Sequence, residues 1–281
     1  MKEMTLQDMH SFCLDIAKEV HMFCITNGIK YSLGYGSLLG AVRHKGYIPW
    51  DDDIDIIMPR PDYERFCKVF KSDKFKLATS QNAYIAYARV YDNEETFCRT
   101  LGKWLKYEHE GAFVDIFPMD AVKSDQESFI LQRDRAKKIL QMQLDNRGAK
   151  KDILDLFRIL PLKEAINSLK VTLKNRFFYE GETDLDVINQ QYQDVMKENE
   201  WVGAKYCALL AYINNYSCKQ IPIKYWDELI MTTFEDTNFL IFKEYDAVLT
   251  EIYGGNYMQI PPKSKQEQHA LAISKFYFIN K

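Results

Sequence analysis

One acidic segment constrains the fold of this chain more than any other part of its sequence. Residues 51–56 read Asp-Asp-Asp-Ile-Asp-Ile. Side chains alternate between the two faces of a β-strand, so an extended segment places Asp51, Asp53 and Asp55 on one face and the isoleucines on the other. The alternation predicts a strand over residues 53–58 whose isoleucine face enters a hydrophobic core.

The carboxylates on that strand face predict a metal site. Like charges held a few ångströms apart repel and raise each other's pKa, and a hard divalent cation is the usual compensation. Mg²⁺ prefers oxygen ligands, with Mn²⁺ as the alternative, and two ions about 3.5–4 Å apart can stabilise both oxygens of a phosphoryl displacement. We expect Asp53 and Asp55 to bind Mg²⁺, with Asp51 supporting them or binding a second ion. The alternative, a solvated acidic turn, is disfavoured by the isoleucines and by the flanking Trp50 and Met58.

A segment containing glycine precedes the acids. Residues 29–35 are expected to form a strand, Gly36 and Ser37 a turn, and residues 38–43 a short helix. Backbone N–H groups at a helix N-terminus can hold a phosphate, and Gly36 lets the backbone approach a ligand closely. A Gly-Ser turn is a weak signal by itself, but the Asp-Ile-Asp sequence begins sixteen residues after Ser37. Gly36 and Ser37 are therefore the expected phosphate-binding residues.

Four basic residues are further candidates for contact with a substrate phosphate. Arg43, His44 and Lys45 lie between the glycine turn and the acids. Arginine suits bidentate phosphate contact, although a solvated basic loop is an equal alternative for each of these residues. Arg89 lies on another expected strand, where a structural ion pair and phosphate binding are equally expected.

The run from residue 36 to residue 56 carries a family resemblance. It reads Gly-Ser-Leu-Leu-Gly-Ala-Val-Arg-His-Lys-Gly-Tyr-Ile-Pro-Trp-Asp-Asp-Asp-Ile-Asp-Ile and resembles the LicD family, which includes fukutin-type proteins, within the nucleotidyltransferase superfamily. The similarity is dense over residues 31–66 and recurs at two later places. It implies an α+β fold in which helices flank a nucleotidyltransferase-like mixed sheet. It also implies an enzyme that moves a phospho-alcohol, often phosphocholine, from a CDP-linked donor onto a cell-surface glycan.

The first later place is a run of Asp-Ile-Phe-Pro-Met-Asp that begins at Asp115, on a strand expected over residues 111–117. A buried carboxylate needs a partner. The resemblance implies that Asp115 is the third carboxylate of the site, either a metal ligand or the base that takes the proton of the acceptor hydroxyl. The alternative is a structural aspartate in a salt bridge. Asp120 is expected to be a cap or turn residue.

The second later place is the C-terminal segment 253–263, Tyr-Gly-Gly-Asn-Tyr-Met-Gln-Ile-Pro-Pro-Lys. Lys263, and His269 beyond it, are candidates for contacts with the phosphates or with the leaving nucleotide, although a lone histidine is more often structural. A choline cation is commonly held by aromatic faces. The aromatic residues nearest the motif in the chain are Tyr35, Tyr47 and Trp50.

The remaining pattern predicts how the chain is organised. We expect helices over residues 6–27, with Thr5 as N-cap and Gly28 at the end, over 61–70 and over 239–253, further strands over 75–79 and 83–92, and a mostly helical charged region over 124–198. These elements predict three parts. Residues 1–122 form a catalytic core, residues 123–200 a helical subregion, and residues 201–281 a segment that packs back on the core and completes the site.

Charge and composition exclude several classes of protein. The formal net charge of −3 disfavours a nucleic-acid binder that relies on a basic face. No segment approaches the roughly 18 apolar residues of a membrane span, and the N-terminus lacks the apolar run of a signal peptide. We expect a cytoplasmic protein, with peripheral association at the inner face of the membrane left open. The six cysteines form no Cys-x-x-Cys pair, so ordinary thiols are expected rather than zinc ligands or disulfides.

These expectations combine into one reaction and two alternatives. The first is Mg²⁺-dependent transfer of a phospho-alcohol, most often phosphocholine in the resembled family, from a CDP-alcohol such as CDP-choline to a hydroxyl of a glycan or lipid-linked glycan, with release of CMP. One alternative is a nucleotidyltransferase that moves NMP from an NTP to a small molecule or protein, because the same carboxylates serve both reactions. The other alternative is a binding protein whose site is inactive.

Overall fold

The computed structural model describes residues 1–100, 110–149, 153–160, 162–178, 181, 184–213, 218–266 and 274–279. The α-helices are α1 (Leu6–Asn27), α2 (Tyr35–Arg43), α3 (Arg60–Val69), α4 (Gln126–Ala149), α5 (Ile153–Ile159), α6 (Leu162–Phe178), α7 (Leu185–Met196) and α8 (Tyr245–Tyr253), and the 3-10 helices are η1 (Ile223–Trp226) and η2 (Lys263–Lys265). The strands are β1 (Ser32–Leu33), β2 (Asp55–Pro59), β3 (Lys76–Ala78), β4 (Ala88–Tyr91), β5 (Thr96–Thr100), β6 (Phe113–Val122), β7 (Tyr206–Ala208), β8 (Ile221–Pro222), β9 (Leu229–Phe234), β10 (Thr237–Phe242) and β11 (Ser274–Phe278).

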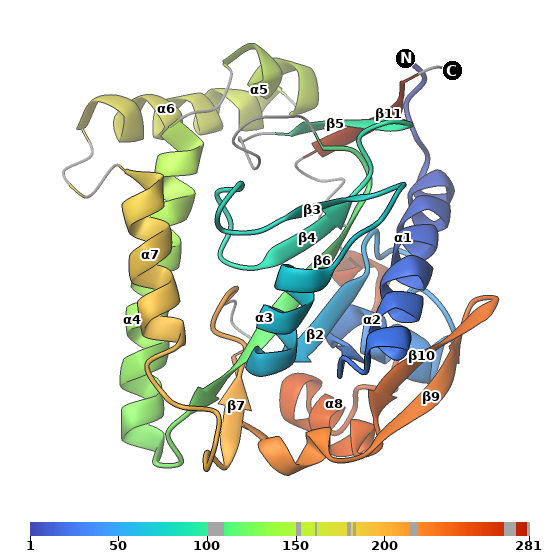
Figure 1. Cartoon of the computed structure of the whole chain (residues 1–281). Helices are drawn as coiled ribbons and strands as arrows, with labels where there is room; N and C mark the ends of the chain where they lie inside the picture. The colour runs from blue at the N-terminus through green and yellow to red at the C-terminus, as the bar shows by residue number, and fades with distance from the viewer. Residues whose placement is uncertain are drawn as a thin grey trace.

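A mixed sheet lies at the centre of the molecule (Figure 1). Its strand order is β1-β2-β6-β4-β3, and β7 pairs with the end of β6 and with β8. Strands β2 and β6 are parallel, whereas β1–β2, β6–β4 and β4–β3 are antiparallel. Every residue of β6 is buried, and α1 and α3 both pack against this strand. The α+β expectation is confirmed, and β6 forms the middle of the core.

Helix α1 has the ends that the sequence predicts. The Thr5 hydroxyl accepts the Asp8 N–H, and the Asp8 carboxylate accepts the Thr5 N–H at 2.8 Å, which forms a capping box. Gly28 ends the helix with φ 61°, a left-handed conformation that glycine adopts without a steric penalty. The helix buries Met9, Cys13 and other apolar side chains at helical spacing.

Two element boundaries near the acids differ from expectation. Helix α2 begins at Tyr35 with Gly34 as its N-cap, so Gly36 and Ser37 lie in its first turn and not in a turn before it. Strand β2 begins at Asp55 and not at Asp53. Both shifts reflect pairing, because β1 ends at Leu33 opposite Ile56, and the acids before Asp55 lie beyond the β1–β2 ladder.

The expected helix over residues 239–253 is wrong in its first part. Residues 229–242 form the β9–β10 hairpin, and α8 begins only at Tyr245. Phe239 and Ile241 are buried whereas Asn238 is exposed, which is the period of a strand. The apolar run was ambiguous because the hairpin turn, at Glu235 with φ 53°, contains no glycine. The strand expected over residues 83–92 is also shorter than predicted, since β4 covers only Ala88–Tyr91.

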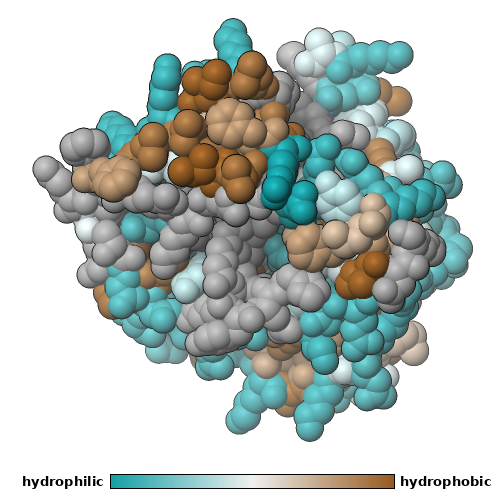
Figure 2. Space-filling model, turned by 90° about the horizontal axis from the view of Figure 1, so that it is seen from above, coloured by the Kyte–Doolittle hydropathy of each residue, from teal (hydrophilic) through white to brown (hydrophobic). Residues whose placement is uncertain are grey.

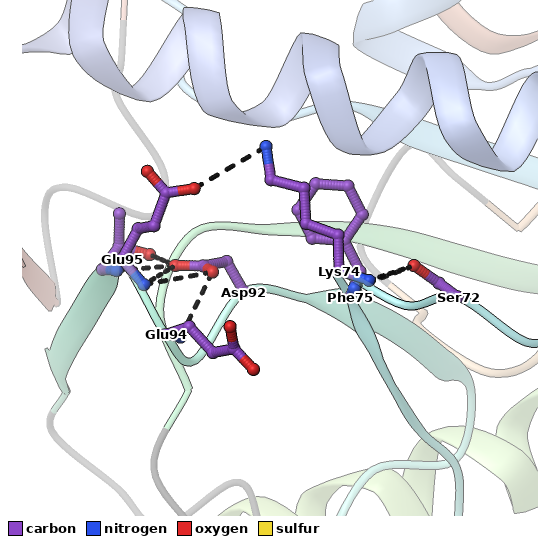
Figure 3. A network of polar contacts seen from close by, with 7 residues as sticks. Ser72, Lys74, Phe75, Asp92, Glu94 and Glu95 are labelled. Carbon is purple, nitrogen blue, oxygen red and sulfur yellow. Dashed lines mark hydrogen bonds and ion pairs between the residues drawn. The ribbon is translucent and has the colours of Figure 1, made fainter.

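The connection after β4 is fixed by the Asp92 carboxylate (Figure 3). This carboxylate accepts the Thr96 hydroxyl and the backbone N–H groups of Glu94, Glu95 and Thr96. Gly111 packs against the same turn, and its N–H donates to the Asp92 carbonyl at 2.6 Å. A Cβ at Gly111 would lie only 2.7 Å from that carbonyl, so the position requires glycine. The turn therefore fixes the position of Glu110 next to β4.

Helices α4 to α7 confirm the helical character expected for residues 124–198. In Figure 1, α4 and α7 stand side by side, and α5 and α6 lie across the top of α4. The Gln132 side chain joins the first pair by donating to the Val195 carbonyl at 2.9 Å. Within the described residues, no helix is both long enough and apolar enough to cross a membrane.

The two ends of the chain lie together. Strand β11 pairs with β5, and the Met4 N–H donates to the Phe276 carbonyl at 2.8 Å.

Candidate active site

The acidic segment enters β2 with the alternating burial that the sequence predicts. The two isoleucines of residues 51–56 are fully buried, whereas Asp51, Asp53 and Asp55 are half-buried. Asp52 falls on the isoleucine side and is completely buried. Residues 51–54 precede β2, so strand alternation does not keep the Asp52 carboxylate away from those of Asp51 and Asp53.

The carboxylates of this segment are close enough to perturb one another. Oxygen atoms of Asp51, Asp52 and Asp53 lie within 4.8 Å of one another. Desolvation and the charges of Asp55 and Asp51 raise the pKa of Asp53 well above its usual range. Desolvation and the charge of Asp115 do the same to the pKa of Asp55. A hard divalent cation with oxygen ligands would compensate these like charges, so the residues fit a metal ion.

Asp115 lies beside Asp55 because the parallel strands β2 and β6 pair these two residues directly. On the other side of β6, strand β4 pairs Arg89 with Asp115. Arg89 donates to the two Asp115 oxygens at 2.6 and 3.1 Å, and to Glu110 at 2.9 Å. Burial alone would lower the pKa of Arg89, but Asp115 and Glu110 outweigh it and raise that pKa. Arg89 is 2% exposed, so its guanidinium orients the third carboxylate.

The N-terminus of α2 meets the acids from another side. The Ser37 hydroxyl accepts the Asp55 N–H at 2.8 Å, which ties the helix to the start of β2. A Cβ at Gly36 would lie 2.5 Å from Asp51 Oδ2, so the absence of a side chain there makes room for this carboxylate. Tyr35 adopts φ 42°, a left-handed conformation that is unfavourable for a bulky residue. Strain of this kind is concentrated at functional sites.

His10 of α1 contacts the acidic segment, and no pattern in the sequence predicts this contact. Its Nε2 bonds to the Asp51 carbonyl oxygen at 2.6 Å, and its ring stacks on Tyr47 at 3.8 Å. The Tyr47 hydroxyl donates to the His10 carbonyl at 2.8 Å. The Tyr47 ring is buried, and the stacked His10 ring occupies one of its faces. The Trp50 side chain is half-buried.

Arg43 ends α2 and its Nε donates to His44 Nε2 at 2.9 Å, whereas Lys45 lies beyond the helix. Arg43 donates to the Tyr257 carbonyl at 2.8 Å and to the Gln259 carbonyl at 3.2 Å, so it joins α2 to the C-terminal segment. Burial lowers the pKa of Arg43. Lys45 is exposed, and its carbonyl accepts the Glu235 N–H at 2.8 Å from the β9–β10 turn.

The C-terminal segment contributes a tyrosine near the acids. Desolvation and the charges of Asp55 and Asp51 raise the pKa of Tyr253, at the end of α8. Tyr253 is the first residue of the C-terminal segment 253–263, and the sequence pattern predicts no role for it. Lys263 lies in η2 and is exposed, and His269 lies outside the described residues.

The expectation for Asp120 as a cap or turn residue is wrong. It lies within β6, is 1% exposed, and accepts from Arg60 at 2.5 Å. Strand β6 continues past residue 117 to pair with β7, which brings Asp120 inside the core. A buried carboxylate there requires a cation, and Arg60 at the start of α3 supplies it.

The protein also contains a cavity of about 510 Å³ between α4, β7 and α8. Phe129, Tyr206, Lys219 and Glu251 are among its lining residues. None of the residues predicted for catalysis, metal binding or substrate binding lines it, so the candidate site is the acidic cluster and not this cavity.

Comparison with known proteins identifies the family. The LicD/FKTN/FKRP nucleotidyltransferase domain matches residues 28–146, which include every acid of the cluster. The lipopolysaccharide cholinephosphotransferase LicD of Haemophilus influenzae is 30% identical over 96% of this chain and 97% of its own length. An uncharacterised protein of Rickettsia typhi is 42% identical over 59 residues, which make up 21% of this chain and 19% of its own length. An uncharacterised protein of Rickettsia prowazekii is 54% identical over 41 residues, which make up 15% of this chain and 15% of its own length. A match of that extent to the Haemophilus protein shows that this chain belongs to the LicD family of transferases.

Proposed function

We propose that this protein transfers phosphocholine from CDP-choline to a hydroxyl of a glycan or lipid-linked glycan. The observation that carries the proposal is the full-length similarity to a protein named lipopolysaccharide cholinephosphotransferase. The clustered acids support it, because phosphoryl transfer depends on positioning and on compensation of charge.

In this reaction the acceptor hydroxyl oxygen attacks the phosphorus of the phosphocholine group. The bond between that phosphorus and the bridging oxygen breaks, and CMP leaves with that oxygen. Asp51, Asp53 and Asp55 would hold Mg²⁺, which when bound would supply positive charge against the phosphate oxygens. Asp115 takes the proton of the acceptor hydroxyl, and Arg89 holds that carboxylate in a fixed orientation through two hydrogen bonds.

The N-terminus of α2 is suited to the donor phosphates. N–H groups in the first turn of a helix attract anions, and Gly36 and Ser37 belong to that turn. The Ser37 oxygen already accepts the Asp55 N–H, so its own hydroxyl proton is directed elsewhere and can be donated to a phosphate oxygen. Lys263 and Lys45 are the exposed cations that we assign to the nucleotide side of the donor.

The decisive experiment supplies the purified chain with Mg²⁺ and choline-labelled CDP-choline, with lipopolysaccharide as acceptor. Release of CMP together with labelled lipopolysaccharide is the expected result. Parallel reactions with CDP-ethanolamine, CDP-glycerol and CDP-ribitol define the alcohol. Reactions with CTP and ATP test for nucleotide transfer. Pyrophosphate release from CTP or ATP, with no CMP release from any CDP-alcohol, would refute the proposal.

The acids are tested by Asp53→Ala, which is expected to lower the rate at least about a hundredfold, since metal charge is worth several kcal/mol at such sites. Asp73→Ala, which removes an exposed acid elsewhere, is the matched control and should keep full activity. A folded Asp53→Ala protein with full activity would show that the reaction uses a different centre.

A further inference from the structure

Helix α6 exposes apolar side chains along one face. Leu162, Ile166, Leu173 and Phe177 are 68%, 41%, 36% and 69% exposed. With the half-buried Leu169 they follow the spacing i, i+4, i+7, i+11 and i+15, which forms one stripe along an α-helix. We call these five residues the α6 stripe.

The α6 stripe is not the face by which the helix packs on the protein. Ala165 and Thr172 are 0% and 1% exposed and mark the packed face, which lies against α4 and α5. Phe157 of α5 is 45% exposed and adds to the apolar surface. Figure 2 shows this surface from above, as brown side chains gathered over α5 and α6. Contiguous exposed apolar patches of this kind mark interaction sites.

The charges beside the stripe indicate which partner it fits. Lys163, Lys170 and Lys174 are exposed and follow the spacing i, i+7 and i+11, so they form a row along one edge of the stripe. The helix carries four basic residues and one acidic residue, a net charge of +3, in a chain of net charge −3. Basic charge is thus concentrated beside the apolar surface.

We propose that α6 is a membrane-docking helix that lies in the interface of an anionic lipid bilayer. An interfacial helix has leucine and phenylalanine on one face and lysine or arginine beside it, so that the apolar side chains enter the acyl region and the cations meet lipid headgroups. A second copy of this chain is a poorer partner, because a symmetric contact would bring two helices of charge +3 together. The inference depends on the α6 surface and not on the proposed reaction.

The test is sedimentation of the full chain with lipid vesicles, without donor or acceptor. Vesicles of phosphatidylcholine with roughly 30% phosphatidylglycerol are expected to bind the protein, and vesicles of phosphatidylcholine alone to bind it at least tenfold more weakly. Because no substrate is present, a failed transfer reaction would leave this result unaffected.

Two pairs of variants distinguish vesicle binding through the α6 stripe from nonspecific binding through any exposed apolar side chain. Ile166→Ser with Phe177→Ser is expected to weaken vesicle binding at least tenfold, since each side chain contributes buried apolar area. Val202→Ser with Met231→Ser, at positions 91% and 52% exposed elsewhere, should change nothing. All four positions are exposed, so the melting temperature should be preserved, and circular dichroism measures it.

The lysine row is tested by charge reversal. Replacing Lys163, Lys170 and Lys174 by Glu is expected to reduce binding to anionic vesicles at least tenfold, since each cation near such a surface contributes about fivefold. The matched control replaces the exposed residues Lys68, Lys71 and Lys205 by Glu. Equal losses in both triple variants would mean that only net charge matters and would overturn the proposal. A concentration-dependent dimer that is lost in the stripe variant, without vesicle binding, would assign the face to a second copy instead.

Discussion

Replacement of Asp53 by Asn should stabilise the metal-free protein. Asn keeps the shape of the carboxyl group and removes one charge from a cluster in which the oxygens of three acids lie within 4.8 Å. At that separation two unit charges repel by about 0.9 kcal/mol in water and about 3.5 kcal/mol at an effective dielectric constant of 20. Asp53 is half-buried, so solvent screening favours the lower part of this interval, about 1 kcal/mol for each of its two neighbours. The expected gain is therefore about 2 kcal/mol.

The gain should depend on pH with a defined sign. Because the pKa of Asp53 is higher in the folded protein than in the unfolded chain, the folded state binds more protons at pH values between these two pKa values. The contribution of Asp53 to the stability of the wild type is therefore fully present below about pH 4, the ordinary pKa of an aspartate, and falls as pH rises toward the pKa of the folded state. The Asn variant and the wild type should have the same stability at low pH and diverge as pH increases.

Thermal unfolding without and with Mg²⁺ is the assay. About 2 kcal/mol corresponds to a rise in Tm of about 4–8 °C for a chain of roughly this size. Mg²⁺ at a hundred times its Kd should stabilise the wild type by about 2.7 kcal/mol, and the variant by much less because a ligand is lost. Asp73→Asn is the control, with the same change in net charge outside the cluster. If Asp53→Asn melts at the wild-type temperature at pH 8 and keeps the full Mg²⁺ shift, the reasoning about this cluster is refuted.

Two further variants test other parts of the structure. Gly36→Ala would place a Cβ 2.5 Å from Asp51 Oδ2, so calorimetry should show Mg²⁺ affinity reduced about tenfold while the stability to unfolding is retained. The control is Gly255→Ala, whose Cβ would have no atom within 4 Å, and this variant should bind Mg²⁺ as the wild type does. Arg60→Met should cost about 3–5 kcal/mol in urea unfolding because it leaves the Asp120 carboxylate buried without its cation, and the double variant with Asp120→Leu should recover most of that loss.

The local pattern was sufficient to predict much of the site. The alternation of acid and isoleucine predicted the burial of residues 51–56, and a single acid within an apolar run predicted that Asp115 would lie on a buried strand. Helix α1 was predicted because its cap, its apolar spacing and its terminal glycine agree. Each of these signals lies within a few residues of the feature it predicts.

The partners of these residues could not be predicted, because they come from distant segments. His10 reaches the Asp51 carbonyl across 41 positions of sequence, and periodicity along α1 gives no sign of it. Arg89 and Glu110 are joined only because β4 pairs with β6 and the Asp92 turn fixes the connection. The β9–β10 hairpin was missed since a short apolar run fits a helix as well as a strand until its pairing partner is known.

The same alternation explains how a protein holds mutually repelling acids in place. Ile54 and Ile56 are fully buried, and each contributes roughly 1.5–3 kcal/mol by leaving water. This gain is of the same size as the repulsion of about 1–3.5 kcal/mol between neighbouring carboxylates, so the isoleucines can hold the acids together without a cation. The Ser37 bond to the Asp55 N–H and the Arg89 bonds to Asp115 then fix the two strands on which the acids lie. The apolar side of the segment thus preorganises its polar side, and a bound cation would release repulsion that the core already sustains.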